Sequence, residues 1–315
     1  MQTILNILYG VSGLALLYYG AEFLVKGGVR IAARLKISPL VVGLTLVAFA
    51  TSAPELVVSV DSALKGFGNI SIGNVIGSNI CNIALILGVC AMITPLNVNK
   101  QLFRIDVPLM ILSAVLLAVF CVFSGGLKLW QGILLLAGII FYTWFSIYCA
   151  RKSEKQNPDG EQISDNSGNI LVAILLVAAG LGALVGGAKL FVNSAVYLAK
   201  LCRISDAVIG LTVVAVGTSL PELATSVVAA IRGEKDIAIG NVVGSNIFNV
   251  LAICGITPLV APVQAPGISK VDLAVMVLLS VMLYPMMKSQ MSISRKEGLS
   301  LFLIYVAYTV YLLIG

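Results

Sequence analysis

The chain has 315 residues, of which 59% are hydrophobic and 11% are charged, and its net charge is +6. Soluble domains have about 25% charged residues, so this composition excludes an ordinary soluble enzyme, a disordered chain, a disulfide-stapled secreted fold and a nucleic-acid-binding protein. It indicates a polytopic membrane protein surrounded by a lipid bilayer, in which basic residues report topology more often than a partner surface.

Ten apolar segments along the chain are long enough to be transmembrane helices. They cover residues 4–25, 38–62, 70–96, 105–124, 127–150, 169–193, 205–231, 237–261, 271–287 and 298–314. Helices are expected rather than barrel strands, because the segments are long and uniformly apolar. The first segment is longer than the apolar part of a signal peptide. We therefore predict an all-α polytopic membrane protein with ten transmembrane helices.

The hydrophilic segment 151–169 divides the chain into two halves of five spans, residues 1–150 and 170–315. If the N-terminus lies outside, the inside connections carry 14 Lys and Arg residues and the outside connections carry 6. Cytoplasmic loops are enriched in these residues. The count therefore predicts a plasma (inner) membrane protein with both termini outside and a cytoplasmic 151–169 linker.

The two halves share an internal repeat at a constant offset of 167 residues. GLTLVAFATSAPELVVS (43–59) matches GLTVVAVGTSLPELATS (210–226), and SIGNVIGSNICNIALILG (71–88) matches AIGNVVGSNIFNVLAICG (238–255). Between Ser38–Gly88 and Ser205–Gly255, 28 of 51 positions are identical. Each half holds an odd number of spans, so the second half enters the membrane in the opposite sense. Such inverted repeats are typical of secondary transporters. A repeat kept for packing alone is the alternative, but packing in lipid does not require the polar residues that match.

Glu55 and Glu222 are the only acidic residues expected deep inside the spans, and the repeat makes them equivalent. A carboxylate at the bilayer centre costs about 2.5 kcal/mol or more, so it indicates a functional site. A salt bridge is the structural alternative, but no Lys or Arg is expected at that depth. Protons or bound cations remain as counter-charges.

Pro54 and Pro221 precede the two glutamates and predict helix breaks that free backbone carbonyls. Such breaks at membrane depth are tolerated where they line a site or a neighbour satisfies the backbone; a kink for packing is the alternative. The next helix of each half adds polar residues at i, i+4 and i+8, which share one helical face. Asn74 and Asn241 in these stripes are also explained by hydrogen bonds between helices. The further candidate residues are Thr51, Ser52, Ser78, Asn82, Thr218, Ser219, Ser245 and Asn249.

This predicted cluster contains only oxygen donors, because the chain has no His and its six Cys are scattered without a CxxC motif. Carboxylate, amide, hydroxyl and carbonyl oxygens suit hard cations such as Ca²⁺, and Na⁺ accepts similar neutral oxygens. Two carboxylates neutralise one Ca²⁺, and they repel each other when it leaves unless Na⁺ or a proton takes its place. The sequence therefore predicts transported Ca²⁺ and Na⁺ and no cofactor.

The motifs ATSAPEL and GSNICN in the first half, and GTSLPEL and GSNIFN in the second, resemble the α-repeats of the cation/calcium exchanger superfamily, here 43–88 and 210–255. Over the whole chain the sequence is similar to prokaryotic sodium/calcium exchangers. The resemblance implies a core of spans 2, 3, 7 and 8, past which the long, tilted spans 1 and 6 slide to alternate access. It implies Ca²⁺ ligands from Glu55, Glu222 and the carbonyls of Thr51 and Thr218. It implies Na⁺ sites built by these glutamates, the carbonyls of Ala48 and Ala215, and the side chains of Ser52, Ser78, Asn82, Ser219 and Ser245.

The predicted function is electrogenic Na⁺/Ca²⁺ antiport that extrudes Ca²⁺, by a monomer with no enzymatic activity. Potassium-dependent members of the superfamily carry Asp where this chain has Asn249, so no K⁺ requirement is expected. A Ca²⁺/H⁺ antiporter using the same glutamates is the nearest alternative. A cation channel is another, since rings of Glu select cations. An intramembrane enzyme is disfavoured, because no span contains a motif with two acidic residues.

Overall fold

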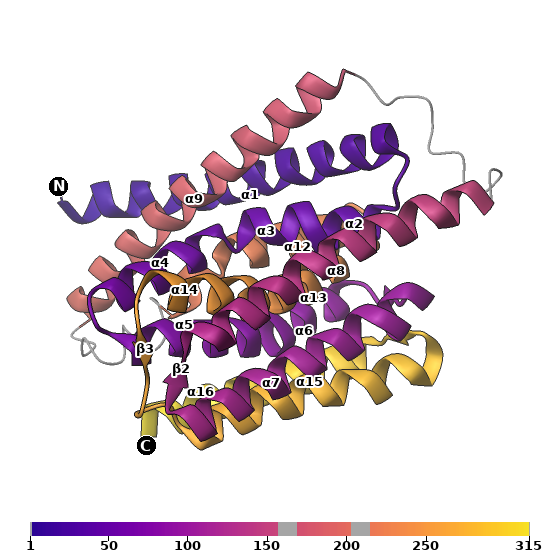
Figure 1. Cartoon of the computed structure of the whole chain (residues 1–315). Coiled ribbons are helices and arrows are strands. Elements are labelled where there is room, and N and C mark those ends of the chain that lie inside the picture. The colour runs from indigo at the N-terminus through magenta and orange to yellow at the C-terminus, as the bar shows by residue number, and fades with distance from the viewer. Residues whose placement is uncertain (1, 157–168, 203–214, 315) are drawn as a thin grey trace.

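The computed structural model describes residues 2–156, 169–202 and 215–314, and these form mostly long helices (Figure 1). Among the described residues, eight helices are long and apolar enough to cross a membrane, and the bent pair Pro39–Thr51 and Ala53–Leu64 makes a ninth span. The predicted span 205–231 falls partly on residues 203–214, outside the described residues. Ten spans therefore remain a prediction.

The first half contains five of the predicted spans, several of them built from consecutive helical pieces; η marks a π-helical stretch. They are α1 (Gln2–Leu35); α2 (Pro39–Val42), η1 (Gly43–Val47), α3 (Ala48–Thr51) and α4 (Ala53–Leu64); α5 (Gly68–Ile80), η2 (Cys81–Leu87) and α6 (Gly88–Ile93); η3 (Leu102–Asp106) and α7 (Val107–Ser124); and α8 (Leu129–Gln156).

The second half follows the same order of elements in its described part. It contains α9 (Ile170–Leu201); α11 (Ala215–Thr218) and α12 (Leu220–Ile231); α13 (Lys235–Phe248), η5 (Asn249–Ile253) and α14 (Cys254–Val260); α15 (Lys270–Gln290); and α16 (Arg295–Ile314).

Helices α1 and α9 are longer than the predicted spans 4–25 and 169–193. They have 34 and 32 residues, whereas about 20 residues cross the hydrocarbon of a bilayer. Lys26 and Lys189 therefore lie within helices rather than in connections. Helix α8 also continues to Gln156, so the segment predicted as a linker from residue 151 begins as helix; residues 157–168 lie outside the described part. Hydropathy locates the apolar part of each helix, but it does not show where a helix ends when its last turns are polar.

Helices α1 and α9 pack together along one side of the molecule and run in opposite directions (Figure 1). Glycines set their close approach: a Cβ atom on Gly13 would lie 2.8 Å from the carbonyl oxygen of Gly187, and one on Gly20 would lie 2.9 Å from that of Gly180. The offset of 167 residues relates Gly13 to Gly180 and Gly20 to Gly187. The two backbones thus meet at equivalent places, where no side chain fits.

Two short antiparallel strand pairs join loops that are far apart in the sequence, and they depart from the all-α prediction. Strand β1 (Leu96–Asn97) pairs with β4 (Ser292–Ile293), and β2 (Gly126–Leu127) pairs with β3 (Val263–Gln264). Two-residue strands leave no hydrophobic pattern from which they could be predicted. Since open strand edges are not tolerated in hydrocarbon, both pairs are expected at the membrane surfaces.

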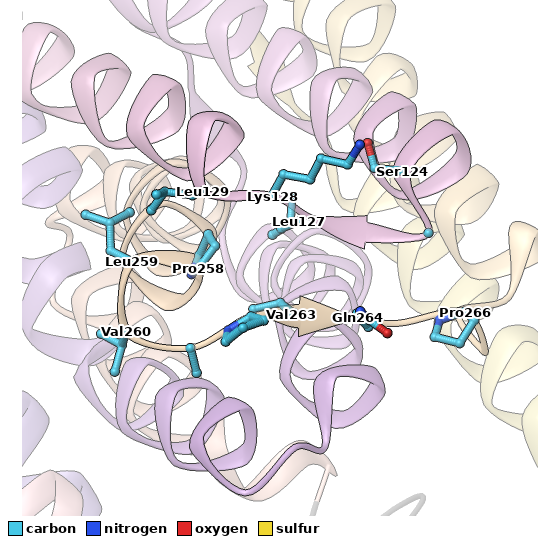
Figure 2. A pocket seen from close by; sticks show the side chains of 13 residues that line it. Ser124, Leu127, Lys128, Leu129, Pro258, Leu259, Val260, Val263, Gln264 and Pro266 are labelled. Atoms are coloured by element: carbon cyan, nitrogen blue, oxygen red, sulfur yellow. The ribbon is translucent and has the colours of Figure 1, made fainter.

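A pocket of about 580 Å³ lies beside the β2–β3 pair. Figure 2 shows Leu127 and Lys128 on one wall of this pocket and Pro258 and Val263 on the other. None of its lining residues belongs to the predicted cation site. The pocket is therefore a feature of the surface loops and is separate from the glutamate cluster.

Glu22 on α1 is a further buried acidic residue, and it lies near the end of the first predicted span rather than deep within it. Its side chain is 11% exposed. Its Oε1 atom lies 2.6 Å from the guanidinium of Arg232, at the end of α12, and 2.8 Å from the ammonium of Lys26. Arg232 is 210 residues away in the chain, so the pair could not be predicted from sequence spacing. The ion pair ties α1 to α12.

Asp106 is also fully buried, at the end of η3. The hydroxyl of Tyr142 donates a hydrogen bond of 2.9 Å to its carboxylate, and Tyr308 donates one of 2.9 Å to Asp272 in the second half. The aspartate and tyrosine are separated by 36 residues in both cases. Each bond ties the fourth predicted span of its half to the fifth.

Candidate cation site

Both predicted helix breaks are present, one in each half. Ser52 separates α3 from α4 with φ −82° and ψ 4°, and Ser219 separates α11 from α12 with φ −87° and ψ 7°. Glu55 and Glu222 therefore stand in the first turns of α4 and α12. The positive end of the helix dipole favours a carboxylate at such a position. Both side chains are 0% exposed.

Each glutamate is bound by the serine of the opposite break. Ser52 Oγ donates to Glu222 Oε1 at 3.0 Å, and Ser219 Oγ donates to Glu55 Oε1 at 3.2 Å. Ser219 also lies 3.3 Å from Ser78 Oγ on α5. These contacts span 170, 164 and 141 residues of sequence. The structure thus brings both helix breaks and α5 together in one buried cluster.

Oxygen atoms without a hydrogen-bond partner collect among the predicted site residues. Of ten such buried side-chain atoms in the described part of the chain, six belong to those residues, and all six are oxygens. They are Oε2 of Glu55 and of Glu222, Oδ1 of Asn82 and of Asn249, Oγ1 of Thr218 and Oγ of Ser245. An unpaired buried polar group costs about 1–3 kcal/mol. Carboxylate, amide and hydroxyl oxygens are the ligands that hard cations prefer, so this set fits such ions.

No basic residue neutralises the two glutamates in the described part of the chain. The ion pairs found there involve the acidic residues Glu22 and Asp61. Nor do three or more His, Cys, Asp or Glu side chains gather there into a metal-binding group. Any ion held by Glu55 and Glu222 must therefore take its further ligands from hydroxyl, amide and backbone oxygens.

Thr51 and Ala48 are brought to the first helix break, but the Thr51 hydroxyl is already engaged. It donates to Asn241 Oδ1 at 3.1 Å and lies 3.4 Å from the carbonyl oxygen of Ala48. That carbonyl also accepts the backbone N–H of Ser52 at 3.0 Å. In the second half, Ala215 begins α11 and its side chain lies outside the described atoms. The carbonyl ligands implied by the resemblance remain predictions.

Asn74 and Asn241 form hydrogen bonds between helices, as expected if these residues hold helices together rather than bind a cation. Asn74 Nδ2 donates to the carbonyl of Glu55 at 3.2 Å and to Ser59 Oγ at 3.0 Å. Asn241 Nδ2 donates to the carbonyl of Glu222 at 3.4 Å and to Ser226 Oγ at 2.9 Å. The same contacts thus recur in both halves and hold each glutamate's helix against its neighbour.

Asn79 and Asn246 join the cluster although the helical stripe did not include them. Asn249 Nδ2 donates to Asn79 Oδ1 at 3.0 Å, and Asn82 Nδ2 donates to Asn246 Oδ1 at 3.1 Å. Asn82 lies within η2 and Asn249 begins η5, and π-helical turns are frequent at functional sites. The identity of the GSNI segments in the two halves was the only signal for Asn79 and Asn246.

Comparison with known proteins places this arrangement among cation transporters. The sequence model of one family, described as "sodium/calcium exchanger protein", matches residues 5–148 and, a second time, residues 172–314. The chain is 35% identical over 347 residues to sodium/calcium exchanger MaX1 of Methanosarcina acetivorans, with 98% of both chains covered. It is 36% identical over 277 residues to inner membrane protein YrbG of Escherichia coli, covering 86% of this chain and 85% of that one.

A solved structure of high similarity is that of the sodium-calcium exchanger NCX_Mj soaked with 2.5 mM Na⁺ and 0.1 mM Ca²⁺. The TM-score is 0.83 and the sequence identity 36%, and the match covers 96% of this chain and 98% of that chain. The likeness thus extends over the whole described fold and is not confined to the glutamate cluster.

Proposed function

Because the chain belongs to the sodium/calcium exchanger family, we propose that it exchanges Na⁺ for Ca²⁺ by alternating access and extrudes Ca²⁺ from the cytoplasm. The observation that carries this proposal is a set of six unpartnered buried oxygens, one on each of two fully buried glutamates and four on other predicted site residues. Family membership and the likeness to NCX_Mj support cation/Ca²⁺ exchange.

Competition for the two carboxylates explains how one ion displaces the other. Glu55 and Glu222 share one cluster and balance the charge of one Ca²⁺. Without it, two buried carboxylates repel each other, so other cations must enter. Hydroxyl and amide oxygens beyond the glutamates offer positions for more than two Na⁺. Exchange of more than two Na⁺ for each Ca²⁺ moves net charge, which is the basis for proposing electrogenic transport.

The proposed ligands divide between the two ions. Ca²⁺ is assigned to the carboxylates of Glu55 and Glu222 and to the carbonyls of Thr51 and Thr218. Na⁺ is assigned to the same carboxylates together with further hydroxyl, amide and carbonyl oxygens. These come from Ala48, Ser52, Ser78, Asn82, Ala215, Ser219, Ser245 and Asn249.

The strand pairs support the proposed architecture of ten spans in two inverted halves. Loops that pair as β2 and β3 lie on one side of the membrane, so the chain between them crosses an even number of times. Helices α8 and α9 and the α13–α14 segment supply three crossings, and a fourth through 205–231 makes the number even. The opposite directions of α1 and α9 support the inversion. Ten crossings put both termini on the same side of the membrane, and the distribution of Lys and Arg favours the outside of the plasma membrane for that side.

The direct test is ⁴⁵Ca²⁺ flux in proteoliposomes with the Na⁺ and pH gradients imposed separately. We expect Ca²⁺ to enter Na⁺-loaded vesicles when they are diluted into Na⁺-free buffer, with a rate that saturates. Flux that follows the pH gradient and ignores Na⁺ would instead establish the Ca²⁺/H⁺ antiporter. Flux that needs no counter-ion would indicate a channel.

Transport is also expected to continue in K⁺-free medium. Asn249 and its equivalent Asn82 are both neutral, so the cluster holds two fixed charges rather than three. The rates of Na⁺-driven ⁴⁵Ca²⁺ uptake with and without K⁺, at constant ionic strength and clamped membrane potential, measure this. Loss of uptake without K⁺ would show that the proposed K⁺ independence is wrong.

A further inference from the structure

Four buried asparagines form two crossed hydrogen bonds between the halves. Asn249 on the second half donates to Asn79 on the first, and Asn82 on the first donates to Asn246 on the second. The offset of 167 residues converts one bond into the other. All four side chains are at most 2% exposed. Each half thus holds an amide of the other half.

The two ends of a carboxamide differ, since its nitrogen donates and its oxygen accepts. In Asn82 and Asn249 the nitrogen is bound, and the oxygen has no hydrogen-bond partner. A rotated amide would place its NH₂ group, which repels cations, where the unpartnered oxygen now lies. The acceptor atoms of Asn246 and Asn79 therefore select the orientation that leaves the oxygens free.

The side-chain nitrogens of Asn79 and Asn246 have contacts of their own, which fix the orientation of these two amides. Asn79 Nδ2 lies 3.4 Å from the carbonyl oxygen of Asn246 and 3.9 Å from Met276 Sδ, and Asn246 Nδ2 lies 3.6 Å from Met110 Sδ. Their Oδ1 atoms are occupied by the partner amides. They are thus placed to orient ligands rather than to bind a cation themselves.

We propose that Asn79 and Asn246 are positioning residues that aim the amide oxygens of Asn249 and Asn82 at bound Na⁺. The inference rests on the proposed Na⁺/Ca²⁺ exchange, in which the carboxylates dominate Ca²⁺ binding and neutral oxygens contribute more to Na⁺ binding. Losing one aimed oxygen therefore weakens Na⁺ binding more than Ca²⁺ binding.

The test compares Asn79→Leu with the unmodified protein in two assays on the same vesicles. Leucine has nearly the shape of asparagine but accepts no hydrogen bond. We expect the Na⁺ concentration for half-maximal Ca²⁺ flux to rise by about fivefold or more, since a lost hydrogen bond changes affinity by such factors. Ca²⁺/Ca²⁺ exchange without Na⁺ should stay within about twofold in half-maximal concentration and rate. Equal losses in both assays would show a merely structural role and overturn the proposal.

A double-mutant cycle separates action through Asn249 from any direct effect. Adding Asn79→Leu to Asn249→Ala should cause no further rise in the Na⁺ requirement, and additive effects would contradict the proposal. Thr257→Val is the matched control, because it removes a buried hydroxyl whose hydrogen bond goes to the carbonyl of Ile253 and not to the four asparagines. It should leave the Na⁺ requirement unchanged. If Asn79→Leu does not fold, Asn79→Ala also removes the acceptor, and Asn246→Leu tests the equivalent bond. Absence of Na⁺-driven flux in the unmodified protein would refute the proposed function itself. That outcome is distinct from a failure of the proposal about Asn79 and Asn246, which concerns only the difference between variants.

Discussion

Replacing Glu222 by glutamine is expected to reduce Na⁺-driven Ca²⁺ flux by more than tenfold, and Glu55→Gln is expected to do the same. The substitution keeps the shape of the side chain and removes its charge. Two unit charges 4 Å apart interact by about 4 kcal/mol at an effective dielectric constant of about 20, and a divalent ion interacts about twice as strongly. No basic residue among the described ones pairs with either carboxylate, so the substitution removes a charge that is available to the proposed cation.

The measurement is initial ⁴⁵Ca²⁺ flux at matched protein density in proteoliposomes. Asp61→Asn is the control, because Asp61 is an exposed acidic residue on the same helix α4 whose carboxylate pairs with Lys65 at 2.6 Å. Its flux should remain within about twofold of the unmodified protein, since exposed ion pairs contribute little. A loss of less than tenfold for either glutamate variant would remove that glutamate from the proposed site.

Gly180→Val is expected to separate α9 from α1 and to lower both the thermal stability and the flux. A Cβ atom on Gly180 would lie 2.7 Å from the carbonyl oxygen of Gly20 and 2.7 Å from the backbone nitrogen of Leu24. Backbone atoms cannot change rotamer to relieve the clash, as a flexible side chain can, so the two helices must move apart. Overpacking costs about 1–3 kcal/mol, which corresponds to a fall of roughly 5 °C in Tm.

Gly182→Val on the same helix provides the matched control, because a Cβ atom there has nothing within 4 Å. It carries the same change in helix propensity without the backbone contact. Thermal unfolding in detergent and flux in proteoliposomes should therefore distinguish the two variants. Equal Tm values would show that the close approach of α1 and α9 does not limit stability.

The glutamate cluster was predictable because its signals are local and occur twice. Pro54 and Pro221 mark helix breaks within one turn of Glu55 and Glu222, and the repeat supplies the same grouping in both halves. A charge inside an apolar segment is costly enough to indicate function without any structure. The structure bears out the breaks and the gathering of the two carboxylates.

The contacts that the sequence did not reveal all join residues far apart in the chain. Glu22 pairs with Arg232 across 210 residues, and Asn249 binds Asn79 across 170. Hydropathy and spacing describe one helix at a time. They predict how deep a residue lies in a span, but they do not predict which residue of another helix it contacts. This is why Glu22 was not expected to be buried and why Asn79 was overlooked.

The Glu22–Arg232 ion pair has a consequence for the balance between the two halves. The repeat relates Glu22 to Lys189 and Arg232 to Lys65, so an attraction on one side corresponds to two positive charges on the other. Under the proposed alternating access, the inverted halves exchange roles, and the contact of α1 with α12 would give way to the equivalent contact of α9 with α4. That contact would bring Lys189 toward Lys65, which pairs with Asp61, in place of the attraction between Glu22 and Arg232. The proposed mechanism therefore favours one resting side for the empty transporter, set by charged residues that differ between the two halves.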